Sequence, residues 1–143
     1  MAQSGTTQNT IDLLRQFDRL ELFRSLPPAI IMELGKKSYT VRYAAGERLV
    51  WQGEFNNDIF ILLEGQLEAS AQGSDKKAPI GPGELFGEIA WLTHGSRAAT
   101  VRALVPSVCL VIKQSDLQIL AYQSPSILQS IAATLARRLR SYL

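Results

Sequence analysis

The amino-acid sequence predicts an α+β fold class: an antiparallel β-roll, or jelly roll, of about eight strands that is flanked by helices at both ends of the chain. Three observations support it. Apolar residues recur at helical spacing in residues 11–37 and again in residues 115–143. Residues 38–113 instead hold short alternating or wholly apolar runs. Turn residues separate these runs, and no helical pattern connects them in the way that a parallel sheet requires.

The N-terminal part is predicted to be a mobile segment followed by two helices. Residues 1–10 are polar, and we expect them to be mobile. Residues 11–23 have apolar side chains at helical spacing. These are Ile11, Leu13, Leu14, Phe17, Leu20 and Phe23. A second helix is expected over residues 28–37, because proline is well tolerated in a first helical turn.

The central part is predicted to be a series of short strands joined by turns. The expected strands are residues 39–43, 48–52, 58–63, 66–71, 99–105 and 107–112. Residues 73–77 and 81–83 have the composition of solvated turns. Gly65 separates two of the strands, and we expect a tight hairpin there because glycine accepts a positive φ.

Two helices are predicted at the C-terminal end. Ser115 is the expected cap of a helix over residues 116–122. Ser124 and Pro125 are the expected N-cap and first residue of a longer helix over residues 125–142. Its apolar residues fall mainly on one face. They are Ile127, Leu128, Ile131, Leu135 and Leu139.

Composition limits the classes of protein that remain. A chain of 143 residues with 46% hydrophobic and 20% charged residues is typical of one globular domain. The net charge of +2 predicts no broad attraction to nucleic acid or to a membrane. The chain has neither a secretory signal nor an apolar run near the roughly 20 residues of a membrane helix. A single cysteine, Cys109, excludes an internal disulfide, so we expect a cytoplasmic protein.

The sequence lacks the residues and motifs of several classes of enzyme. His94 is the single histidine, so a His/Cys metal cluster is excluded, and no nucleophile turn for a catalytic triad is present. Neither of the glycine-rich motifs that bind phosphate groups, GxxxxGK(S/T) and GxGxxG, occurs in the sequence. We therefore predict no catalytic residues, no metal and no enzymatic activity. His94 is expected at the surface, Cys109 in the core, and Trp51 and Trp91 in the core or at an interface.

One stretch, LFGEIAWLTHGSRAATV over residues 85–101, places isolated opposite charges among small and apolar residues. A short helix that starts after Gly87 presents N–H groups that favour an anion. Arg97 can fork onto two phosphate oxygens, whereas Glu88 accepts a hydrogen bond from a sugar hydroxyl. The alternative is that Glu88 and Arg97 form a salt bridge that only staples the loop. The spacing leaves both interpretations open.

The same stretch closely resembles the phosphate-binding cassette of the cyclic nucleotide-binding domain family, whose pattern is approximately FGE-x-A-L-L followed by P-R-x-A-T-V. Upstream, AAGERLVWQGEFNNDIFILLEGQLEAS resembles the early strands of that family. The resemblance covers roughly residues 22–143. It implies one cyclic nucleotide-binding domain over residues 11–143, with N-terminal helices at 11–37, a β-roll at 38–113, the cassette at 85–101 and C-terminal helices at 115–143.

The resemblance also implies roles for single residues. Glu88 takes the ribose 2′-hydroxyl, and Arg97 holds the cyclic phosphate together with nearby backbone N–H groups. The implied ligand-binding residues are Gly87, Glu88, Ile89, Ala90, Arg97, Ala98 and Ala99. Two positions depart from the pattern: Ser96 replaces a common proline, and Trp91 replaces a smaller apolar residue. Neither departure removes a ligand contact.

The expected ligand is cAMP, with cGMP as the alternative. Relatives selective for cGMP often carry threonine after the arginine, where this chain has Ala98. In the family the last helix is a lid over the base, so its movement would signal ligand occupancy. Arg138 and Leu135 are the base and lid candidates. The alternatives are a solvated arginine and a leucine that belongs to the core face of the helix.

No effector is visible in the sequence. The chain ends where a transcription factor of this family would begin a helix-turn-helix, so neither nucleic acid nor membrane is an expected partner of this chain. An effector domain, a partner protein and a homo-oligomer remain open. The competing hypothesis is a docking or dimerisation module of the same fold that uses no nucleotide. The presence of both Glu88 and Arg97 argues against it.

Overall fold

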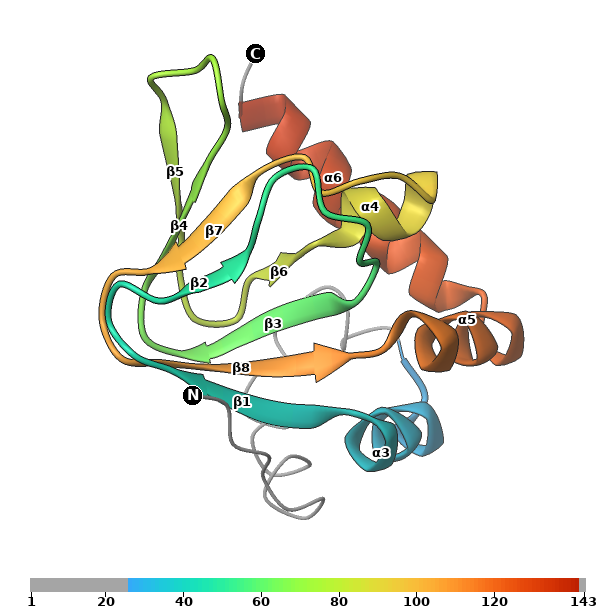
Figure 1. Ribbon diagram of the computed structural model, residues 1–143. Coiled ribbons are helices and arrows are strands. Elements are labelled where there is room, and N and C mark those ends of the chain that lie inside the picture. The colour runs from blue at the N-terminus through green and yellow to red at the C-terminus, as the bar shows by residue number, and fades with distance from the viewer. Residues whose placement is uncertain (1–25, 142–143) are drawn as a thin grey trace.

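The computed structural model describes residues 26–141, and the predicted segments at residues 1–10 and 11–23 lie outside them. The fold class is confirmed: within residues 26–141, eight strands form two four-stranded antiparallel sheets, flanked by helices (Figure 1). The strand orders are β1-β8-β3-β6 and β2-β7-β4-β5. In chain order the elements are α3 (Pro28–Lys37), β1 (Tyr39–Tyr43), β2 (Arg48–Val50), β3 (Ile59–Glu64), β4 (Leu67–Ser70), β5 (Lys77–Ile80), β6 (Leu85–Phe86), α4 (Glu88–Thr93), β7 (Thr100–Ala103), β8 (Ser107–Ile112), α5 (Gln114–Gln123) and α6 (Ser126–Ser141).

Strand β3 is buried on both faces and separates two hydrophobic cores. Ile59, Ile61 and Leu63 face the helices, whereas Phe60 and Leu62 face the interior of the roll. Strand β8 alternates in the same way. This explains why the sequence of β3 is continuously apolar, because a strand covered on both faces has no solvent-facing positions.

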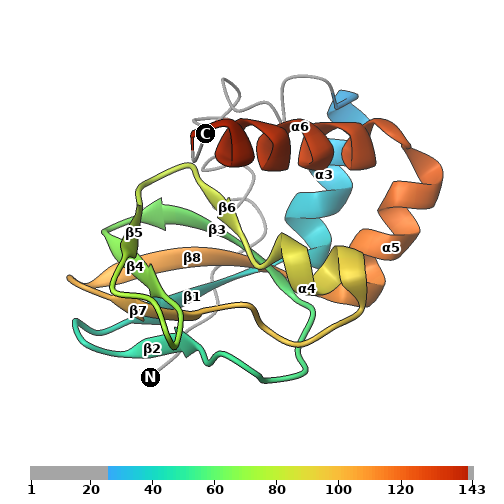
Figure 2. The same ribbon diagram turned by 90° about the horizontal axis from the view of Figure 1, so that it is seen from above.

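The helices gather at one end and along one side of the roll (Figures 1 and 2). Helices α3 and α5 lie together beyond β1 and β8, and α6 runs from α5 past α4 toward the side of the β4–β5 hairpin. Ile127 and Ile131 anchor the first half of α6 in the core that the helices share with the sheet. The structure thereby brings a C-terminal helix alongside the predicted cassette.

The hairpin predicted at Gly65 is wrong. Strand β3 pairs with β8 on one edge and β6 on the other, so it has no free edge for β4, which pairs with β5 and β7 in the second sheet. Gly65 is instead a corner between sheets, with φ of +108°. A Cβ there would lie 2.7 Å from the Cα of Ser107, so the corner requires glycine for space as well as for conformation.

Two predicted helix starts also differ from the structure. Helix α5 begins at Gln114, with Lys113 as N-cap, so Ser115 is inside the helix and not its cap. The side chain of Asp58 supplies the missing acceptor, because its Oδ1 accepts a hydrogen bond from Gln114 N at 3.1 Å. Helix α6 begins at Ser126, and Ser124 ends α5 as its C-cap. The local sequence therefore predicted that both helices exist, but it did not predict the hydrogen bond from Gln114 to Asp58 at the start of α5.

The other singled-out residues divide between core and surface. Cys109 and Trp91 are confirmed in the core, and His94 is confirmed as exposed at the end of α4. Trp51 is 45% exposed, so it is not in the core, and its alternative predicted position at an interface stays a prediction. Over residues 26–141, the helices are all too short or too polar to cross a membrane.

Candidate functional site

Helix α4 begins at a glycine whose conformation and position both exclude a side chain. Gly87 is the N-cap, with φ of +89°. A Cβ at this residue would lie 2.7 Å from Nη1 of Arg97 and 3.0 Å from the carbonyl oxygen of Asp58. The sequence therefore needs glycine here so that the arginine can reach the start of the helix.

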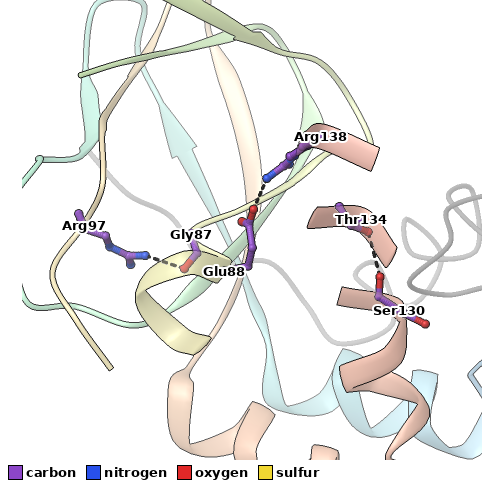
Figure 3. A network of polar contacts seen from close by, with 6 residues as sticks. All are labelled: Gly87, Glu88, Arg97, Ser130, Thr134 and Arg138. Atoms are coloured by element: carbon purple, nitrogen blue, oxygen red, sulfur yellow. Dashed lines mark hydrogen bonds and ion pairs between the residues drawn. The ribbon is translucent and has the colours of Figure 1, made fainter. Parts of the chain in front are cut away.

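Arg97 lies buried beside that glycine, with 4% of its surface exposed. Its Nη1 donates a hydrogen bond to the Gly87 carbonyl at 3.2 Å, as drawn in Figure 3. Its Nη2 donates to Asn56 Oδ1 at 3.2 Å and to the Asp58 carbonyl at 2.8 Å. These acceptors use three of the five N–H donors of a guanidinium.

The main chain around Arg97 is anchored to the loop between β2 and β3. Arg97 N donates to the Glu54 carbonyl at 2.8 Å, and Gly53 N donates to the Arg97 carbonyl at 2.9 Å. The Asn57 amide nitrogen, turned toward α4, donates to the carbonyls of Ala90 and Gly95 at 3.3 and 3.1 Å. The loop at residues 53–58 thus holds the segment between α4 and β7 at both ends, through Asn57 near the end of α4 and through the main chain of Arg97.

The electrostatic surroundings of Arg97 combine burial with nearby acids. Burial lowers the pKa of Arg97, while the charges of Asp58, Glu54 and Glu88 raise it. Arginine stays charged in proteins, so this site holds a largely desolvated cation. The guanidinium carbon also lies 5.5 Å from the centre of the Phe60 ring, which stacks on Phe86 with ring centres 5.0 Å apart. A cation–π contact of this kind supports the buried charge.

Glu88 is also buried, with 2% exposure, but it does not pair with Arg97. Its Oε1 accepts a hydrogen bond from Nη1 of Arg138, which comes from α6. Figure 3 shows the two arginines approaching the start of α4 from opposite sides. Within residues 26–141 Glu88 and Arg97 form no ion pair, so the hypothesis of a Glu88–Arg97 salt bridge as a loop staple is wrong.

The remaining predicted residues take different environments around α4. Gly87 and Ala99 are half-buried, and Ala90 is buried. Ile89 and Ala98 are exposed. The structure therefore gathers the predicted cassette residues on α4 and the loop that follows it, as expected, with Glu88 and Arg97 as the buried charges.

The two candidates on α6 lie on the side of the helix that faces the domain. Leu135 is partly buried and packs against the core that the helices share with the sheet. The Arg138 side chain, 35% exposed, reaches Glu88. The interpretation of Arg138 as a merely solvated residue is therefore wrong. A place for Arg138 over a purine ring stays a prediction.

The loop before β3 is the part of the site that sequence reasoning missed. Asn56 and Asp58 hold Arg97, and Asn57 holds the turn. The available signal was a run of three polar residues, Asn56 to Asp58, directly before a wholly apolar strand. Among the described residues, no group of three or more His, Cys, Asp or Glu side chains is placed to hold a metal ion.

Comparison with known proteins connects this geometry to a family. The sequence profile described as the cyclic nucleotide-binding domain matches residues 40–124. The matched segment holds all but the first residue of the two sheets, together with α4 and the whole loop that positions Arg97, and it ends at the C-cap of α5.

Two of the relatives match over most of the chain. A cyclic AMP receptor protein of Thermus thermophilus is 31% identical over 124 residues, which are 83% of this chain and 57% of that protein. A cyclic nucleotide-gated potassium channel of Rhizobium etli is 30% identical over 117 residues, covering 82% of this chain and 32% of the channel. The chain thus spans little more than half of the first relative and a third of the second.

Solved structures have the same fold. The crystal structure of a cyclic nucleotide-binding domain from Methylobacillus flagellatus superposes with a TM-score of 0.82, at 17% sequence identity, over 99% of this chain and 84% of that one. At that identity the likeness shows the fold alone. It includes the helices as well as the roll, because nearly all of this chain is covered.

Proposed function

The chain belongs to the cyclic nucleotide-binding domain family, and on this premise we propose that it binds cAMP and signals the binding through its C-terminal helix α6. The domains of this family are ligand-binding regulatory domains, and we propose no enzymatic activity for this chain. One observation carries the proposal. A desolvated arginine, Arg97, is fixed at the start of a helix by acceptors that use only part of its donor capacity.

The cyclic phosphate is the ligand group that suits Arg97. Three of its N–H donors have acceptors among the described residues, which leaves two for phosphate oxygens. A charge-assisted hydrogen bond in a desolvated site is worth about 1.5–3 kcal/mol. The N–H groups at the first turn of α4, near Ile89 and Ala90, would add further donors to the same anion.

The ribose is the ligand group that suits Glu88. A carboxylate accepts hydrogen bonds only, so it can bind the 2′-hydroxyl but not the phosphate. Because Glu88 and Arg97 come from opposite ends of the cassette, they would address different parts of one nucleotide. Ala98 offers no hydroxyl to a guanine amino group, which supports cAMP over cGMP by about 1 kcal/mol.

The proposed signal is a change in the position of α6. Leu135 and Arg138 lie on the inward side of this helix, one packed on the core and the other paired with Glu88. A nucleotide that binds more tightly when α6 covers the base would shift the population toward that arrangement, by no more than its differential affinity. An effector domain, a partner protein or a second copy would receive the shift.

A docking module is the second candidate, and exposed apolar residues on α6 favour it. Leu128 is 44% exposed and Leu139 is 63% exposed. A partner that covers them would bind through the same helix without any nucleotide. The buried charges of Glu88 and Arg97 have no role in such contacts, which is why we place nucleotide binding first.

The proposal is tested by equilibrium titration of the purified protein, freed of bound nucleotide, with cAMP, cGMP and 5′-AMP. We expect saturable binding of cAMP, weaker binding of cGMP, and much weaker binding of 5′-AMP because its phosphate is not cyclic. If folded protein binds none of the three, the docking module becomes the better account. If cGMP binds as tightly as cAMP, the argument from Ala98 is wrong.

A further inference from the structure

We infer that Glu88 is a shared acceptor, which holds α6 through Arg138 with one carboxylate oxygen and binds the ribose 2′-hydroxyl with the other. This inference rests on the proposed function and deepens it. It makes Arg138 a positioning residue that acts on the ribose through Glu88, rather than a residue that acts only on the base. The strength of the ribose contact and the position of α6 would then depend on each other.

The first observation is the pairing itself. Nη1 of Arg138 donates to Oε1 of Glu88, and Glu88 is 2% exposed. A buried carboxylate without a cationic partner is strongly unfavourable, so Arg138 compensates a charge that the proposed ribose contact needs. The carboxylate has a second oxygen with its own lone pairs, so it can accept from a neutral hydroxyl while Oε1 accepts from the guanidinium.

The second observation is that the contacts on the inward side of α6 change from apolar to ionic along the helix. Ile127 and Ile131, exposed by 0% and 1%, fix the first half of the helix in the core, and Leu135 packs there partly. One turn further, an ionic contact, the Arg138–Glu88 pair, connects the helix to the domain. Separation of the last turn from the domain would therefore leave the anchoring residues Ile127 and Ile131 in the core but would leave the buried carboxylate of Glu88 without Arg138.

A side-chain hydrogen bond within α6 lies at the point where the contacts of the helix change from apolar to ionic. Thr134 Oγ1 donates to the Ser130 carbonyl at 3.1 Å (Figure 3). Hydroxyl bonds of this kind, four residues back, weaken a helix slightly and favour bending. The segment of α6 that Arg138 holds therefore begins beside a turn that can bend.

The experiment compares cAMP with 2′-deoxy-cAMP, whose only difference is the missing ribose hydroxyl. The ratio of the two Kd values measures how much the 2′-hydroxyl contributes to binding. We expect the wild-type protein to bind cAMP at least about fivefold more tightly than 2′-deoxy-cAMP. Arg138→Gln removes the charge that orients Glu88, so the ratio should fall toward one. Arg138→Lys, which keeps the charge, should give an intermediate ratio.

The matched control is Arg140→Gln, which removes a charge from the same helix turn at an exposed position and should leave the wild-type ratio. An unchanged ratio in Arg138→Gln would overturn the inference, because Arg138 would then act independently of the ribose. A larger ratio would overturn it as well, because Arg138 and the hydroxyl would then compete. A wild-type ratio of one would show that Glu88 does not bind the hydroxyl.

A second measurement needs no nucleotide and separates the inference from the proposed function. Hydrogen exchange of the amides in residues 135–140 should be faster in Arg138→Gln and in Glu88→Gln than in the wild-type protein, and unchanged in Arg140→Gln. Unchanged exchange in both of the first two variants would overturn the role of the pair in holding α6. Absence of any cyclic nucleotide binding by folded wild-type protein would instead overturn the proposed function itself.

Discussion

Arg97 and Gly87 fit together with no room for a methyl group between them. Nη1 of Arg97 lies 3.2 Å from the Gly87 carbonyl oxygen and would lie 2.7 Å from a Cβ at that residue. The positive φ of Gly87 turns the chain into α4 at the same point. One residue therefore determines both where the helix starts and where the buried cation lies.

Gly87→Ala should weaken cAMP binding by about tenfold or more, because the added methyl group displaces the guanidinium and a charge-assisted contact is lost. Gly46→Ala is the matched control. Gly46 has φ of +86°, close to the +89° of Gly87, but a Cβ there would have nothing within 4 Å. Both variants carry a similar conformational cost of about 1 kcal/mol, so equal affinities for cAMP would contradict the account.

Asp58 connects Arg97 with α5. Its main-chain oxygen accepts from Arg97 Nη2 at 2.8 Å, while its carboxylate accepts from Gln114 N at 3.1 Å. Asp58→Ala should lower the free energy of unfolding by about 1 kcal/mol, because it removes the acceptor at the start of α5. Asp58→Asn keeps an acceptor oxygen and should cost less. Urea unfolding of the three proteins checks the order, and an unaffected Asp58→Ala variant would contradict it.

Cys109 should make stability depend on pH in the alkaline range. Burial raises the pKa of the Cys109 thiol from 9.0 to about 12. A raised pKa for an acid favours the neutral thiol in the folded state, so this stabilisation is complete below pH 9 and is lost as pH rises toward 12. The contribution to unfolding free energy should fall by about 1.4 kcal/mol between pH 8 and pH 10.

The measurement is the pH dependence of urea unfolding in the wild-type protein and in Cys109→Ala. Burial also raises the pKa of Tyr39 and Tyr43, but both tyrosines are present in each protein. Because the charge of Cys109 also helps to raise the pKa of Tyr43, the difference between the two pH profiles reports the thiol together with its effect on that tyrosine. Parallel profiles would show that Cys109 ionises in the folded protein as readily as in the unfolded chain.

Ala98 should be the position at which nucleotide preference is easiest to change. It is exposed, so a larger side chain fits without disturbing the core. Ala98→Thr should improve cGMP affinity relative to cAMP by roughly two- to tenfold, the worth of one added hydrogen bond. Ala98→Val is a control of similar shape without the hydroxyl. The same shift in both variants would contradict the hydrogen-bond argument.

The elements that depend on local pattern were predictable from the sequence. The expected strand at 107–112 and the expected helix at 28–37 have the bounds of β8 and α3. In β8, alternate residues face the two cores, and in α3 a proline at the first position marks the start of the helix. Such signals lie within a few residues of one another, so sequence reasoning reaches them.

Contacts between distant residues were not predictable. The pairing of Glu88 with Arg138 joins residues 50 positions apart, and the hydrogen bond from Gln114 to Asp58 spans 56. The pairing of β3 with β8 rather than β4 is of the same kind. In each case the partner is set by how the sheets and helices pack, and the local sequence of either residue is compatible with other partners.

The central claim is that Arg97 binds the cyclic phosphate, and calorimetric titration with cAMP of the wild-type protein, Arg97→Ala and Arg42→Ala tests it most directly. Arg42 is an exposed arginine on β1, so its loss controls for the change in net charge. We predict that Arg97→Ala weakens binding by about 10-fold to 150-fold and that Arg42→Ala leaves it unchanged. Equal affinity of wild-type and Arg97→Ala proteins, both folded and nucleotide-free, would contradict the claim.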